Sequence, residues 1–387
     1  MREETTGYDA SHIQVLEGWE AVRKRPGMYI GSMSERGLRT MVLEVADRAV
    51  NEVLAGRARS VEVTLTSDGG VRISDDGSAS PLDEPRGAAA PGLEALLTSM
   101  RAGARPVGRH TVEVGPFTVG PSVVNALSRR MTAEVRHGGI RWIQEYARGV
   151  AVTPLSEAGT APDSGTTITF WPDPDIFETM EFSFDALADR FRELAFLNRA
   201  LDLSLIDHRH PGEPRSARFR FPGGTRDFVT FLDTGTTAPA LTETISFELE
   251  DPRMAGTLEV AFRWSDSPDE QIHTFANSRP TIGGTHELGF RDGVAAAINA
   301  YAHKHLRLPT EPAPTLDADR ISKGLTAVVS VKLDDPELQG ATRAVLGNPP
   351  VRTCVEQAVQ QHLAPWLEQH PTQATTLTER LQTPHQH

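Results

Sequence analysis

The chain has 387 residues, of which 39% are hydrophobic and 24% charged, the composition of a globular protein long enough for two or three domains. The net charge of -13 argues against broad, sequence-independent DNA binding, and the sequence has no run of about 18 apolar residues that could span a membrane. The single cysteine, Cys354, excludes an internal disulfide. Because the N-terminus is polar and lacks the apolar core of a signal peptide, we expect a cytoplasmic protein.

The first part of the chain predicts a polar arm over residues 1–11 and then a short helix to about residue 21. The clearest helix spans residues 37–54, and Gly56 ends it. Two alternating segments, 61–65 and 71–74, predict a β-hairpin. The apolar residues that recur at helical spacing in the 37–54 helix are Leu38, Met41, Val42, Val45, Ala49 and Val53.

The remaining segments predict two α+β units joined near residue 222. Loops are expected over 77–92 and 101–121, and the tail from residue 371 is polar enough to predict disorder. Strands are expected around 131–150, 166–170, 244–249, 257–264 and 325–333, and helices at 184–197, 287–303 and 350–367.

Several stretches, in one order from about residue 8 to 367, resemble the gyrase B and topoisomerase IV B proteins. The resemblance implies a GHKL (Bergerat-type) α/β sandwich over 1–221, and then a transducer domain of ribosomal protein S5-like fold over 222–370. By this resemblance the Toprim and DNA-gate regions of the family would lie beyond residue 387, so we expect no topoisomerase activity from this sequence alone. The matching stretches are Tyr8–Leu16, Ala21–Ser32, Ser122–Ser128, Phe170–Pro172 and Gly283–Arg291.

The polar face of the 37–54 helix carries the first part of the implied nucleotide site. Where the family has a catalytic glutamate and then an Asp-Asn pair, this sequence has Glu44, Asp47 and Arg48, followed by Asn51. The resemblance makes Glu44 the base that activates water. Arg48 replaces the asparagine that holds Mg²⁺, and a guanidinium has no acceptor atom, so we expect the metal site to be lost. The same residues also fit the solvated face of an amphipathic helix.

The helical spacing suggests a partner for Arg48. Glu44 lies four residues earlier on the same helix, so we expect an ion pair between the two in the ligand-free protein. A small acidic ligand could then exchange with Glu44 for the guanidinium.

Asp75 and Gly77 in the Asp-Asp-Gly turn, together with Thr166, match the residues that surround adenine in the family. Alone, this motif is also an ordinary turn after a strand. The loop that follows reads Ser-Ala-Ser-Pro over 78–81 in place of the family's Arg-Gly-Ile-Pro.

The phosphate loop departs most from the family. Its glycine-rich pattern, whose N–H groups close around phosphate, here reads Val-Gly-Pro-Phe-Thr-Val-Gly over 114–120. Gly120 remains, but two glycines are replaced, and Pro116 and Pro121 offer no N–H. The triplet that reaches the γ-phosphate from the transducer is altered as well, with Arg343 in place of a lysine.

We therefore expect a gyrase-B-like protein with a degenerate ATP site, no certain cofactor and no metal. Three functions stay open: a binding protein that acts on gyrase or on an inhibitor of gyrase, a pocket repurposed for another small molecule, and a weak ATPase. In the second, Glu44, Asp47 and Arg48 would do acid–base work or bind an acidic substrate. Tyr8 matches an arm that crosses to the second protomer in the family, which implies a homodimer.

Overall fold

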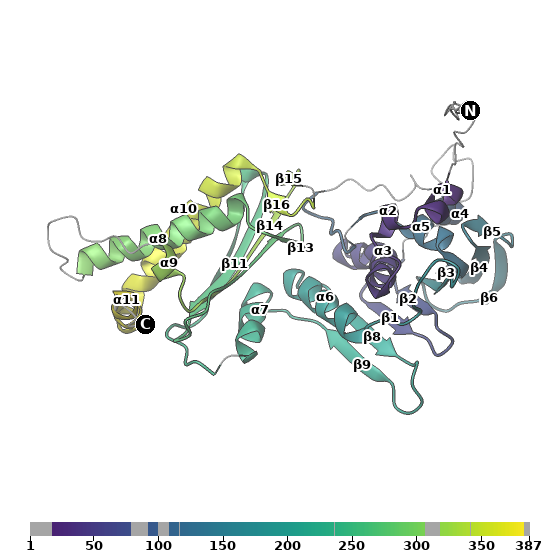
Figure 1. The fold of residues 1–387 in the computed structure, drawn as a ribbon, viewed down its shortest axis with the longest axis horizontal. Coiled ribbons are helices and arrows are strands. Elements are labelled where there is room, and N and C mark those ends of the chain that lie inside the picture. The colour runs from purple at the N-terminus through teal and green to yellow at the C-terminus, as the bar shows by residue number, and fades with distance from the viewer. Residues whose placement is uncertain are drawn as a thin grey trace, which may run out of the picture.

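The computed structural model describes residues 18–78, 92–99, 108–115, 117–235, 237–305, 318–340 and 342–382. It has two lobes, one from each half of the chain, which lie at opposite ends of the long axis with α6 (Phe184–Leu197) and α7 (Thr225–Leu232) between them (Figure 1). The expected polar arm, Tyr8 included, lies outside these residues. Among the helices described, none is long and apolar enough to cross a membrane.

The first lobe is built on a sheet of nine described strands, in the order β5-β4-β3-β7-β2-β1-β8-β9, with β6 paired to β4. Its strands are β1 (Val61–Leu65), β2 (Val71–Asp75), β3 (Ser128–His137), β4 (Ile140–Ala147), β5 (Val150–Ala151), β6 (Ser156–Thr160), β7 (Gly165–Pro172), β8 (Leu203–Asp207) and β9 (Arg215–Phe219). Besides α6, its helices are α1 (Trp19–Lys24), α2 (Gly27–Ile30), α3 (Glu35–Leu54), α4 (Gly92–Thr98) and α5 (Pro121–Ala126).

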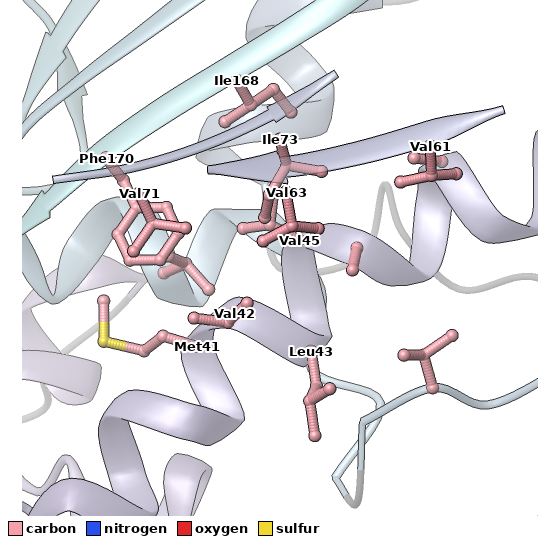
Figure 2. Close-up of a cluster of buried hydrophobic side chains, with 14 of the residues drawn as sticks. Met41, Val42, Leu43, Val45, Val61, Val63, Val71, Ile73, Ile168 and Phe170 are labelled. Carbon is pink, nitrogen blue, oxygen red and sulfur yellow. The ribbon is translucent and has the colours of Figure 1, made fainter. Parts of the chain in front are cut away.

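Helix α3 holds the first lobe together because its apolar face packs on β1, β2 and β7. All the residues predicted to form that face are buried. The predicted helix is therefore confirmed, two residues longer at its N-terminal end. The side chains that meet beneath the sheet (Figure 2) include Met41, Val42 and Val45 from α3 and Val63, Val71, Ile73 and Phe170 from the strands.

The second lobe has a five-stranded sheet in the order β10-β11-β14-β12-β13, and α8 and α10 lie side by side on one of its faces (Figure 1). Its strands are β10 (Ile245–Asp251), β11 (Gly256–Trp264), β12 (Gln271–Ala276), β13 (Arg279–Thr281) and β14 (Leu325–Leu333), with the small hairpin of β15 (Leu338–Gln339) and β16 (Val345–Leu346). Its helices are α7, α8 (Thr285–His305), α9 (Ala318–Ile321), α10 (Pro349–Gln369) and α11 (Pro371–Gln382).

A separate apolar cluster joins the lobes. Phe196 at the end of α6 stacks on Phe228 of α7, with ring centroids 4.6 Å apart. Phe275 and Val328, from the second sheet, complete the cluster. Because α6 belongs to the first lobe and α7 packs on the second sheet, this contact fixes the end of α6 against the second lobe.

The predicted disorder from residue 371 is wrong for residues 371–382, which form α11. Ala374, Leu377 and Leu381 are buried in the core of the second lobe. They recur at i, i+3 and i+7, so the helix buries one narrow apolar stripe although its composition is polar.

Candidate functional site

The polar face of α3 is covered by residues 112–115 and 117–120, which donate backbone N–H groups to its side chains. Glu44 accepts from Thr118 and Gly120 at 3.0 Å each, and from Phe117 at 3.3 Å. A side chain at residue 115 would prevent this approach, since a Cβ built on Gly115 would lie 2.4 Å from Oε1 of Glu44.

The closure buries Glu44, of which 1% is exposed. Burial raises the pKa of the Glu44 carboxyl, and the nearby negative charge of Asp47 raises it further. Hydrogen bonds from the backbone of Gly120 and Phe117 oppose this rise, because they favour the charged form. Glu44 thus has the environment of a general base, but protein donors occupy both of its oxygens.

The next two turns of α3 hold the same segment. Oδ1 of Asp47 accepts from the N–H of Val114 at 3.1 Å. Asn51 exchanges two hydrogen bonds with the backbone of Val112, its Nδ2 donating to the carbonyl at 2.8 Å and its Oδ1 accepting from the N–H at 2.9 Å. The structure therefore brings Glu44, Asp47, Asn51 and Gly120 together, and it joins them through the backbone of 112–115 and 117–120.

Arg48 points to the other end of the site. Its Nη1 lies 2.7 Å from Oδ2 of Asp75, and its Nη2 lies 3.0 Å from Oγ1 of Thr166. Antiparallel pairing of β2 with β7 places Asp75 opposite Thr166, so one guanidinium reaches both. The other oxygen of Asp75 accepts from the N–H of Gly77 at 3.0 Å.

The expected ion pair between Arg48 and Glu44 is therefore wrong. Spacing along the helix allows the pair, but backbone donors already occupy both oxygens of Glu44. The guanidinium instead binds the Asp75 carboxylate and the Thr166 hydroxyl on the neighbouring strands β2 and β7. Only 8% of Arg48 and 4% of Asp75 is exposed, which makes their contact a buried ion pair.

Arg343 stands apart from these residues. It is exposed, on a turn with φ of 49°, where its N–H donates to the carbonyl of Gly340 at 3.1 Å. No hydrogen bond or ion pair joins its side chain to the parts of the site that the structure describes.

Sequence reasoning did not find Arg190 of α6. With 13% of its side chain exposed, it donates to the carbonyls of Glu113 and Val114 at 3.3 Å and to that of Ser278, in the second lobe, at 3.2 Å. Burial lowers the pKa of this guanidinium. Its targets are backbone carbonyls, which have no sequence signature, so only the tertiary structure shows that it ties the segment over Glu44 to the second lobe.

The site does not fit Mg²⁺. Within the residues described, no group of three His, Cys, Asp or Glu side chains could hold a metal ion. At the position where the resemblance requires an amide oxygen, Arg48 presents only donors.

Comparison with known proteins places this arrangement in a family. The DNA gyrase B family model matches residues 224–386. The DNA gyrase B protein of Streptomyces coelicolor is 42% identical over 393 residues, which cover 97% of this chain and 57% of that protein. The 43K ATPase domain of Thermus thermophilus gyrase B, solved with an aminocoumarin, is 33% identical with a TM-score of 0.79, and the match covers 95% of this chain and 94% of that one.

The chain belongs to the DNA gyrase B family. The topoisomerase IV ATP-binding domain of Francisella tularensis, solved with a small-molecule inhibitor, is also similar, with 28% identity, a TM-score of 0.75 and 95% of this chain covered. The expected fold, a GHKL sandwich followed by a transducer domain, is confirmed. This gyrase B relative spans less than three fifths of the full-length protein from Streptomyces coelicolor.

Proposed function

We propose that this gyrase B relative neither hydrolyses ATP nor needs it, and that it acts in the cytoplasm through binding rather than turnover. The observation that supports this most directly is the contact of Arg48 with Asp75 and Thr166. The resemblance assigns those two residues to adenine, and here the protein's own guanidinium takes their acceptor atoms.

At the adenine end, a nucleotide would have to break the buried pair. The adenine amine is a donor, so it competes with Arg48 for Asp75, and the displaced guanidinium would be left without its partner. Breaking a buried ion pair costs about 3–5 kcal/mol, which would weaken nucleotide binding by roughly 10²–10⁴-fold.

The phosphate end offers no compensation. The N–H groups of 117, 118 and 120, which could hold phosphate oxygens, already donate to Glu44. A triphosphate placed there would meet the negative charges of Glu44 and Asp47 without a metal ion between them. Both ends of the site thus favour the closed, nucleotide-free arrangement.

Phosphate release at saturating Mg-ATP tests the proposal, with Glu44→Ala as the matched control. We expect the same background rate from both proteins. Turnover that disappears in Glu44→Ala would contradict the proposal.

A second variant separates binding from hydrolysis. Arg48→Asn frees Asp75 and Thr166, so we expect it to tighten the binding of ATP measured by calorimetry. Phosphate release should stay at background, because the segment over Glu44 still keeps its N–H groups engaged.

A further inference from the structure

A cavity of about 470 Å³ lies between the two lobes, beside the nucleotide-type site. Its walls come from α3, α6, residues 114–115, β13, Thr342 and Ala344. Clefts of this volume at domain interfaces are frequent ligand sites. Val114 and Gly115 belong both to this wall and to the segment that closes over Glu44, so the cavity adjoins that segment.

The cavity wall is rich in arginine. Two of its arginines have partners: Arg190 pairs with Glu193 at 3.3 Å, and Arg279 pairs with Glu113 at the same distance. The other acidic residue in the wall, Asp189, pairs with Arg192. The arginines of the wall are Arg36, Arg39, Arg190 and Arg279.

Arg36 and Arg39 differ from the other two. Neither side chain has an ion pair or a hydrogen bond to any of the residues that the structure describes. Arg36 is exposed and Arg39 is half-buried. Since the acidic residues of the wall already have arginine partners, the cleft carries two positive charges that no carboxylate in the described part of the chain balances. A guanidinium binds phosphate or carboxylate through two parallel N–H groups, so such an excess favours an anion.

We propose that this cleft binds a small molecule with two anionic groups, phosphates or carboxylates, through Arg36 and Arg39 of α3 on one side and Arg279 of β13 on the other. Such a ligand would bridge the lobes and fix α3 relative to the second sheet. The proposal does not rest on the fate of the nucleotide site, because no hydrogen bond or ion pair joins these three arginines to Asp75, Thr166 or Glu44.

Calorimetric titration of the full chain with inorganic pyrophosphate, and separately with citrate, tests the proposal. Both titrations are made at constant ionic strength in a buffer free of divalent cations and of other polyanions, and the two probes distinguish a phosphate ligand from a carboxylate ligand. The test variant is Arg36→Gln/Arg39→Gln. The matched control is Arg129→Gln, which removes an exposed arginine of β3 outside the cleft.

We expect at least one probe to bind the native chain, and the double variant to weaken that binding by about tenfold or more, because it removes two charge-assisted contacts. Arg129→Gln should bind as the native chain does. Arg48→Asn should also leave the affinity unchanged, which separates this cleft from the nucleotide site.

The proposal is overturned if neither probe binds, if the double variant binds as well as Arg129→Gln does, or if Arg48→Asn changes the affinity for the probe. A thermal unfolding curve without ligand checks that the double variant is folded. Loss of folding is not expected, because neither the Arg36 nor the Arg39 side chain makes a hydrogen bond or an ion pair with the residues that the structure describes.

Discussion

The buried contact between Arg48 and Asp75 gives a prediction that the structure allows us to quantify. The two side chains are 10% and 2% exposed, so water screens the pair little. Asp75→Asn keeps an acceptor for the N–H of Gly77 but leaves the guanidinium without its carboxylate. We expect this variant to lose about 3–5 kcal/mol of unfolding free energy, and Arg48→Met to lose a similar amount.

The double variant decides whether these losses come from one contact. With both charges removed, no buried charge is left unpaired, so we expect the combined loss to be about 2 kcal/mol or more below the sum of the single losses. Urea unfolding followed by tryptophan fluorescence measures all four proteins, and amide exchange in β7 reports on the first lobe alone. If the losses add to within about 0.5 kcal/mol, Arg48 and Asp75 do not interact and the reasoning fails.

Three further predictions concern other parts of the chain. Glu44→Ala removes the acceptor for the amides at 117, 118 and 120, so their hydrogen exchange should become roughly tenfold faster or more, and unchanged exchange would show that the closure does not depend on Glu44. Burial lowers the pKa of His286 to about 4. Between about pH 6.5 and pH 4 the unfolded chain therefore binds a proton that the folded chain does not, so the free energy of unfolding should fall by up to about 3 kcal/mol as the pH falls through that window. Urea midpoints of the native chain and His286→Gln measure this, and equal pH dependence in both would contradict it. We also propose a homodimer formed through the N-terminal arm. Light scattering should give a dimer mass for the full chain and a monomer mass for the chain without residues 1–14, and equal masses would rule out a dimer that depends on the arm.

The sequence alone determined the elements whose pattern is local. Apolar spacing predicted α3, and that prediction placed Glu44, Asp47 and Asn51 on one face because a helix fixes the angle between successive residues. Alternation predicted the hairpin of β1 and β2, which brings Asp75 to a strand end. The resemblance then assigned these residues to one site before any contact was known.

Only the tertiary structure decided which partners these residues take. Helical spacing predicted that Arg48 pairs with Glu44. The register of β2 against β7 instead places Asp75 and Thr166 side by side, within reach of the Arg48 guanidinium. Glu44 in turn is satisfied by backbone N–H groups, which every residue except proline carries and which no side-chain pattern reveals. The polar composition of the tail predicted disorder, although α11 carries a narrow apolar stripe. That stripe is buried against the core of the second lobe, which distant segments of the chain form.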